Sequence, residues 1–218
     1  MYNSFSNIIS IDYKNEPFSI LDLSKTNNEL QTLQFNKTGA FSKYVNSKIE
    51  SANAKFAIGK YGEDRIIYND STVFKGSERR SIHLGIDFWT EAGVDVFAPL
   101  DSEVHSFKNN NNSGDYGPTI ILMHKNESQV LYTLYGHLSL SSIQNLEVGK
   151  KFSRGDKIGE IGNTDVNGNW PPHLHFQLIT NMLNYHGDFP GVCKPSEKEK
   201  FFQLSPNPNT VLKIPELD

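Results

Sequence analysis

The sequence predicts a mainly β protein, with an antiparallel β-sheet or sandwich as its core and an N-terminal extension that contains α-helix. Two observations predict this class. From Arg65 onward, short runs rich in β-branched and aromatic residues are separated by turn signals. These turn signals lie so close together that no long helix fits between them. The length of 218 residues, of which 37% are hydrophobic, allows one main core with appendages.

The first 65 residues are polar, rich in asparagine and mixed in pattern. One helix is predicted there, over about residues 42–55, because its apolar residues recur at helical spacing. These apolar residues are Tyr44, Val45, Ile49 and Ala52. We expect residues 1–65 to form a cap or brace beside the main domain.

The main domain is expected to span residues 66–182 and to consist of short strands. The runs that favour strands are residues 66–68, 94–97, 119–122 and 130–135. Asn110, Asn111 and Asn112 predict an exposed hairpin loop. The remaining residues, 183–218, are rich in proline and charge, and we expect them to pack on the domain as a tail with one short helix over 197–204.

The charge balance argues against two classes of partner. The formal net charge is −4 at pH 7 and the pI is about 6.0, whereas binding to nucleic acid or anionic lipid needs basic clusters. We therefore expect no nucleic-acid partner. No stretch approaches the ~20 apolar residues of a membrane-spanning helix, so no membrane span is expected.

The N-terminus lacks the basic start and unbroken apolar core of a secretory signal, which predicts a cytoplasmic location for the sequence as written. Cys193 is the single cysteine, so an internal disulfide is excluded. Because it has neither a CxxC partner nor an obvious base beside it, we expect this thiol to be inert.

Histidines are the residues that indicate a function. His173 and His175 are two apart in a strand-like run, so their imidazoles share one face. Upstream, His83 and Asp87 are four apart, which is ~13 Å along a straight strand and too far for one ion. Gly85 lies midway between them, where a bulge or turn costs little.

These residue types suit a zinc site that hydrolyses a bond. Such a site keeps three nitrogen or oxygen ligands from the protein and leaves a fourth position open, and His83, Asp87 and His175 would supply the three. His137, at the end of a strand-like run, and His173 could then take a proton from the attacking water or stabilise an oxyanion. The predicted reaction class is zinc-assisted hydrolysis of an amide.

Three motifs follow one another in the chain: His83-x-x-x-Asp87, Tyr135-Gly136-His137-Leu138 and His173-Leu174-His175-Phe176. In this order and at these separations they resemble the M23 family of zinc metallopeptidases, of the lysostaphin and LytM type, which cut peptidoglycan cross-bridges and stem peptides. The resemblance runs from about His83 to Leu178, and the glycine-spaced run 148–164 also matches.

The resemblance implies a zinc endopeptidase with an antiparallel β core, an open groove and one Zn²⁺ per chain. It implies that His83, Asp87 and His175 bind the metal and that His137 and His173 act catalytically. The implied partner is a peptide or peptidoglycan fragment, and members usually act at the bacterial cell envelope.

One loop departs from the family pattern. Residues 164–172 are longer than the usual small Ser/Thr/Gly segment and contain Trp170, which either forms a wall of the groove or packs under the loop. The Asn-Trp-Pro-Pro sequence at its end resembles a variant of the domain built into larger proteins beside kinase-like and aminotransferase domains. Because the loop borders the site, it bears on substrate preference.

Two other functions remain open. One is a catalytically silent zinc-binding domain that regulates another enzyme, although all five functional residues are retained. The other is a carrier or phosphoryl-transfer module of the related hybrid β-sandwich type, in which Asp87 would have no evident role. A further hypothesis is latency, in which a side chain from residues 1–60 occupies the fourth zinc position.

Overall fold

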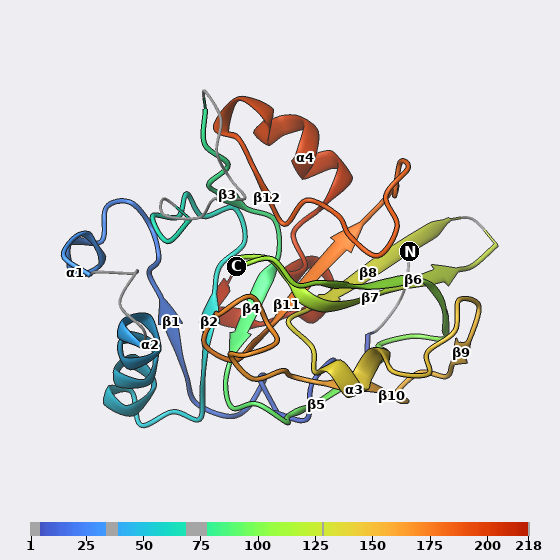
Figure 1. Ribbon diagram of the computed structural model, residues 1–218, viewed down its shortest axis with the longest axis horizontal. Coiled ribbons are helices and arrows are strands. Elements are labelled where there is room, and N and C mark those ends of the chain that lie inside the picture. The colour runs from blue at the N-terminus through green and yellow to red at the C-terminus, as the bar shows by residue number, and fades with distance from the viewer. Residues whose placement is uncertain (1–4, 34–38, 69–77, 128, 218) are drawn as a thin grey trace.

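An eight-stranded sheet organises the computed structural model, which describes residues 5–33, 39–68, 78–127 and 129–217. Its strands are β1 (Phe18–Leu21), β2 (Phe56–Gly59), β4 (Ile86–Trp89), β6 (Ser102–Asn110), β7 (Gly117–Lys125), β8 (Val130–Gly136), β9 (Lys151–Phe152) and β11 (His173–Ile179). They lie in the order β1-β2-β4-β11-β8-β7-β6-β9 (Figure 1). All neighbours are antiparallel except β1 and β2, which are parallel. The predicted mainly β, antiparallel class is confirmed.

Two short ribbons flank this sheet. In one, β5 (Asp95–Phe97) pairs with β10 (Lys157–Glu160), and in the other, β3 (Ile82–His83) pairs with β12 (Val192–Cys193). The helices are α1 (Asn28–Gln31), α2 (Ala40–Ser51), α3 (Leu140–Ile143), α4 (Lys198–Leu204) and α5 (Asn209–Leu212), with 3₁₀ turns η2 (Pro195–Glu197) and η3 (Pro215–Leu217). The two predicted helices are therefore present as α2 and α4.

One local prediction was wrong, and another was wrong at Asn110 alone, since Asn111 and Asn112 are exposed in the loop after β6. Residues 66–68 form a bend and turn rather than a strand. The apolar side chain of Ile67 is instead buried in a cluster with Trp89. Asn110 is not part of an exposed loop, since it ends β6 at 3% exposure. Its amide donates to the Thr119 hydroxyl and to the Gly187 carbonyl, so its polarity is satisfied inside the fold.

The two strands at the centre of the sheet, β4 and β11, divide their residues between two faces with the period of two that a strand imposes. On one face lie apolar side chains of the main core, namely Ile86, Phe88, Leu174, Phe176 and Leu178. On the other lie Asp87, Trp89, His173, His175 and Gln177. This alternation separates the packed core from a polar face on the same pair of strands.

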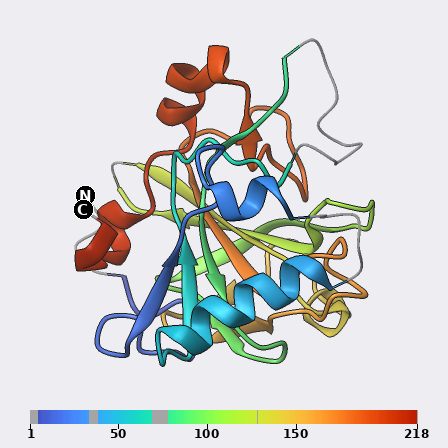
Figure 2. The ribbon, with the colours of Figure 1, turned by 90° about the vertical axis from the view of Figure 1, so that its left-hand side faces the viewer.

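The N-terminal segment extends the sheet and enters its core. Strand β2 pairs with β4, and α2 crosses over β1 and β2 (Figure 2). Phe41 and Val45 of α2 pack with Trp89 in a second apolar cluster. Before β1, Ile8 and Tyr13 are almost fully buried in the main core. The segment is thus part of the packed structure in its described portions.

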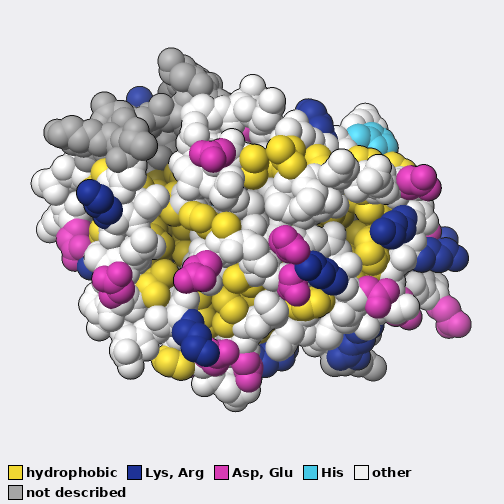
Figure 3. Space-filling view, turned by 60° about the horizontal axis from the view of Figure 1, so that its bottom comes forward, with side chains coloured by type: hydrophobic (Ala, Val, Ile, Leu, Met, Phe, Trp, Pro, Cys, Tyr) yellow, Lys and Arg dark blue, Asp and Glu magenta, His cyan; other side chains and the backbone are white. Residues whose placement is uncertain are grey.

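Charges of both signs are mixed on the surface shown in Figure 3, where acidic and basic side chains alternate with apolar ones. This pattern agrees with the small net charge of −4. Within the described residues, no helix combines the length and apolar character needed to cross a bilayer.

Candidate metal and catalytic site

The sheet register brings the predicted site residues together. Across β4 and β11, His175 is paired with Asp87 and His173 with Trp89. Residues paired in this way stand side by side on one face of a sheet. His137 directly follows β8, whose last residue, Gly136, is paired with His175 on the opposite side of β11.

His83 reaches the same place because the chain bends between β3 and β4. Leu84 and Gly85 interrupt the two strands, as the glycine between His83 and Asp87 predicted. A Cβ at Gly85 would lie 2.6 Å from Cε1 of His175, so a side chain there would displace the imidazole. The bend and the missing side chain allow His83 and Asp87 to face His175 together.

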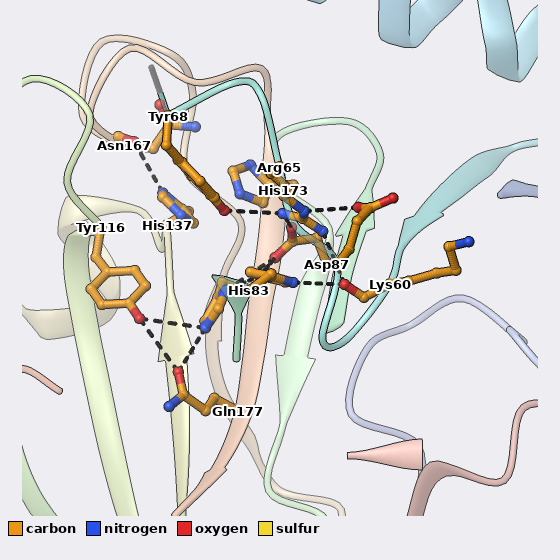
Figure 4. Close-up of polar contacts among 12 residues, drawn as sticks. Lys60, Arg65, Tyr68, His83, Asp87, Tyr116, His137, Asn167, His173 and Gln177 are labelled. Atoms are coloured by element: carbon orange, nitrogen blue, oxygen red, sulfur yellow. Dashed lines mark hydrogen bonds and ion pairs between the residues drawn. The ribbon is translucent and has the colours of Figure 1, made fainter. Parts of the chain in front are cut away.

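Three ligand atoms converge at this point. His83 Nε2 lies 3.2 Å from Asp87 Oδ1 and 3.0 Å from His175 Nδ1, and His175 Nδ1 lies 3.0 Å from the same carboxylate oxygen (Figure 4). All three side chains are almost fully buried. They form a group that could hold a metal ion.

Hydrogen bonds on the far side of each ring set which nitrogen carries the proton. His83 Nδ1 donates to the Lys60 carbonyl at 2.9 Å, and His175 Nε2 donates to Gln177 Oε1 at 2.9 Å. Gln177 is itself oriented, because its Nε2 donates to the carbonyl of Pro190 and to the hydroxyl of Ser205. The opposite nitrogens therefore keep their lone pairs, and these point toward the carboxylate.

This donor set fits a zinc ion. Two imidazole lone pairs and a carboxylate oxygen facing one another repel unless a cation lies between them. Tetrahedral bonds of ~2.0–2.1 Å separate ligand atoms by roughly 3.3 Å, close to the spacing found here. The second hydrogen bond of each imidazole is the feature that holds metal-ligating histidines in position.

His137 and His173 form a second pair beside the three converging atoms. Their ring centroids are 4.0 Å apart, and His173 also stacks on Trp89 at 3.8 Å. His137 Nδ1 donates to the Asn167 carbonyl and His173 Nδ1 to the Pro171 carbonyl. In both rings the Nε2 atom consequently has a lone pair that can accept a proton.

The backbone at His137 is unusual for a residue with a side chain. Its φ of 63° lies in the left-handed region. Its N–H donates to the Tyr116 carbonyl, and its carbonyl accepts from Gly162, each at 2.8 Å. Non-glycine residues in this conformation are strained, and surrounding contacts must hold them there. These two hydrogen bonds fix the direction in which the imidazole leaves the end of β8.

Burial controls the charge of the site. It lowers the pKa of His83 and of His173 to about 4, and together with neighbouring His173 it holds the pKa of His137 well below its usual range. Burial alone raises the pKa of Asp87, but His83 and Arg65 outweigh it and keep that pKa well below the usual range. The carboxylate is thus ionised and these three imidazoles are neutral near pH 7.

A cavity of about 300 Å³ opens onto these residues. Asp87, His137, His173 and His175 form part of its wall. Aromatic side chains form another part, and they are Tyr68, Trp89, Tyr116, Trp170, Tyr185 and Phe189. Trp170 meets Tyr68 and Phe41 edge to face, so it both lines the cavity and packs against its neighbours. Among described residues 5–33 and 39–60, none lines this cavity.

Several residues around the site were not predicted from the sequence. Arg65 contacts Asp87, Gln177 contacts His175, and the Tyr116 hydroxyl lies 3.4 Å from both Gln177 Oε1 and His175 Nε2. Gln177 could have been found, because it is two residues after His175 and shares its face. Arg65 gave no comparable signal, since it is 22 residues from Asp87 in the sequence.

One buried histidine and the single cysteine lie away from the site. His124 is fully buried, with Nε2 at 2.8 Å from the Thr133 hydroxyl and Nδ1 at 3.2 Å from the Asp101 carbonyl. Cys193 is buried in β12, and burial raises the pKa of its thiol to about 11. The thiol therefore stays protonated near neutral pH, as expected for an inert cysteine.

Comparison with known proteins gives one family. The model of peptidase family M23 matches residues 81–186. Peptidoglycan DD-endopeptidase ShyA of Vibrio cholerae serotype O1 is 36% identical over 104 residues, which are 47% of this chain and 21% of that protein. The chain thus spans about a fifth of the length of this curated relative.

Solved structures of similar proteins include two peptidases. One is a zinc-containing peptidase from Vibrio cholerae, with 29% identity and a TM-score of 0.37 over 46% of this chain and 28% of that one. The other is the catalytic domain of the antimicrobial peptidase lysostaphin from Staphylococcus simulans, with 22% identity and a TM-score of 0.42 over 72% of this chain and 96% of that one. The family match spans all five residues of the two clusters. The match of residues 81–186 supports an M23 peptidase.

Proposed function

We propose that this protein is a zinc-dependent endopeptidase that hydrolyses amide bonds in peptides of the peptidoglycan type. The observation that carries the proposal is the convergence of two imidazole lone pairs and one carboxylate oxygen within 3.2 Å of one another. In this proposal His83, Asp87 and His175 hold one zinc ion. The peptidoglycan substrate is supported by the family and by the activity named for the Vibrio cholerae relative.

Zinc supplies Lewis-acid chemistry at such a site, which acidifies water and polarises a carbonyl group. The chain's own residues then handle the protons. His137 and His173 are neutral, and each has a lone pair on Nε2 because Nδ1 is bonded to a carbonyl. One of them can take a proton from the attacking water through Nε2, and the protonated Nε2 can then donate to the developing oxyanion or return the proton to the leaving amine.

The lining of the cavity suits a peptide better than a large flat ligand. Aromatic walls such as Tyr68 and Trp170 offer apolar contact, while Asp115, Asp188 and Arg80 provide charges of both signs. A peptide stem carries amide groups, short apolar side chains and terminal charges, which match such a mixture. Ligand sites of this kind combine apolar walls with a few placed polar groups.

Zinc content and hydrolysis measured on the same preparations test the proposal. The wild type should contain about one zinc per chain and release peptides from purified peptidoglycan, detected by mass spectrometry. His175→Ala should lose both properties. His137→Ala should keep its zinc and lose ~10²- to 10⁴-fold in rate, the range for a general acid-base group. His105→Ala, on a ring stacked with His186 away from the site, is the matched control.

Each alternative function predicts a different result. Zinc in the wild type without hydrolysis of any peptidoglycan fragment would favour a silent zinc-binding domain. No zinc in the wild type, even after the metal is added back, would contradict the peptidase mechanism. It would favour the carrier or phosphoryl-transfer module. In that case Asp87→Ala should leave phosphorylation of a histidine largely intact.

A further inference from the structure

A buried arginine from outside the matched family segment contacts the carboxylate of the candidate metal site. Arg65 has no solvent exposure, and its Nη1 lies 2.6 Å from Asp87 Oδ2. We propose that Arg65 is a positioning residue that fixes the orientation of the Asp87 carboxylate toward the metal. The inference rests on the zinc site of the proposed function and adds a residue to it.

The two oxygens of Asp87 have separate partners. Oδ1 faces His83 Nε2 and His175 Nδ1, and Oδ2 accepts from the Arg65 guanidinium (Figure 4). A charge-assisted bond of this length is among the stronger hydrogen bonds in proteins. It opposes rotation of the carboxylate and keeps Oδ2 away from the metal position. Asp87 is therefore set to offer a single oxygen.

Arg65 can do this because its own guanidinium is fixed on the other sides. Its Nε pairs with Glu63 Oε2 at 3.0 Å, and its Nη1 also donates to the Tyr68 hydroxyl at 3.1 Å. Glu63 is anchored in turn, since its Oε1 accepts from the N–H of Leu23 at 3.0 Å. Two groups besides Asp87 thus hold the guanidinium here, the Glu63 carboxylate and the Tyr68 hydroxyl.

One backbone carbonyl links the arginine to a second ligand of the site. The Lys60 carbonyl accepts from Arg65 Nη2 at 3.3 Å and from His83 Nδ1 at 2.9 Å. The preceding residue, Gly59, leaves the necessary room, because a Cβ there would lie 2.6 Å from Arg65 Nη2. The turn after β2 therefore orients both His83 and Asp87. Supports of this kind change metal affinity when they are removed.

A lysine cannot replace this arrangement, although it conserves the charge. The guanidinium donates through three nitrogens in a fixed plane, whereas an ammonium is a single point on a flexible stem. Arg65→Lys therefore separates charge from geometry. If Arg65 only neutralised buried carboxylates, the lysine would preserve zinc binding; if it orients Asp87, zinc binding will weaken.

The test is a titration of zinc into the metal-free full chain in competition with a chromophoric chelator. We expect the zinc dissociation constant of Arg65→Lys to rise about ten- to hundredfold, the range for loss of an outer hydrogen bond to a ligand. Asn209→Ala is the control for general destabilisation. It removes two buried hydrogen bonds between Asn209 and Ile214, away from the site, and should bind zinc as the wild type does.

The outcomes separate this inference from the proposed function. A wild type that binds no zinc overturns both. A wild type that binds zinc, with a folded Arg65→Lys variant of equal affinity, overturns only the role of Arg65, and so does an equal loss in Asn209→Ala. If Arg65→Lys does not fold, the double variant Glu63→Gln/Arg65→Gln replaces the buried ion pair by neutral groups. It should show the same loss of affinity, and wild-type affinity in it would overturn the role.

Discussion

At the scale of single residues, carbonyl groups and one amide decide what the site histidines can do. Lys60, Pro171 and Asn167 each accept from the Nδ1 of an imidazole, and Gln177 accepts from the Nε2 of His175. A neutral imidazole has one donor and one acceptor nitrogen, so the bonded nitrogen fixes the other as a lone pair. In the proposed function, the same residue type is thereby turned either toward a metal or toward a substrate.

Histidine burial also makes stability depend on pH, and His124 allows this to be measured away from the site. Burial lowers the pKa of His124 to about 4 from an ordinary value of 6.5. Between these values the unfolded chain binds the proton and the folded protein does not, so stability falls as the pH falls. Above pH 6.5 neither state is protonated there, and the contribution is constant.

We expect His124→Gln to reduce this dependence. From pH 7 to pH 4, the zinc-free wild type should lose about 3 kcal/mol more unfolding free energy than the variant, because a shift of one pKa unit corresponds to 1.36 kcal/mol. Urea unfolding at a series of pH values, followed by circular dichroism, measures the difference. Parallel curves for the two proteins would show that the buried imidazole is protonated in the folded state.

At the scale of elements, the break between β3 and β4 and the pairing of β4 with β11 build the site. His83 and Asp87 lie on different strands because the chain bends at Leu84 and Gly85. The register then places Asp87 directly beside His175. A shift of one residue would turn the candidate site residues on that strand into the apolar core.

Gly85→Ala tests this break. The added Cβ would lie 2.7 Å from His175 Nε2 and from the Phe176 carbonyl, so the imidazole must move. We expect a loss of about 1–3 kcal/mol in unfolding free energy from overpacking and at least a tenfold loss of zinc affinity. The control is Gly159→Ala, whose Cβ would meet the Ser142 hydroxyl at 2.6 Å in a region outside the site.

The control should lose stability and keep its zinc affinity. Both quantities come from chemical unfolding and from chelator competition on the same samples. Equal zinc affinity in the two variants would mean that the bend tolerates a side chain, and that the close approach of Gly85 to His175 has no part in forming the site.

At the scale of the whole molecule, segments on both sides of the matched stretch 81–186 complete the structure. The segment after β2 supplies Arg65 and the Lys60 carbonyl, and Ser205 after α4 orients Gln177. Residues before β1 pack in the main core, where the Ile8 carbonyl accepts from Phe97 at 2.9 Å. The N-terminal segment is therefore expected to support the fold rather than to cover the site.

A pair of isoleucine substitutions distinguishes these two roles of the N-terminal segment. Ile8→Ala removes a fully buried side chain, and we expect it to lower the unfolding free energy by about 2–5 kcal/mol. Ile20→Ala, at a side chain that is 40% exposed on β1, should change it by less than about 1 kcal/mol. Urea unfolding measures both. A small effect at Ile8, with faster hydrolysis, would instead indicate a latent enzyme with a removable cap.

The sequence by itself determined the fold class and which residues are candidates for the site. Alternating residues around His173 and His175 predicted a strand with two imidazoles on one face, and Gly85 predicted the bend that brings His83 to Asp87. These inferences succeeded because they depend on spacings of two to four residues, which local backbone geometry converts directly into positions.

Only the tertiary structure decided which groups surround those ligands. Arg65 forms an isolated β-bridge with Ser24 in the segment after β2, and its contact with Asp87 depends on the pairing of β2 with β4. Gln177 faces His175 through its oxygen only because Ser205 and Pro190 accept from its nitrogen. Such contacts join segments far apart in the chain, and they follow from the packing of the whole fold rather than from any local pattern.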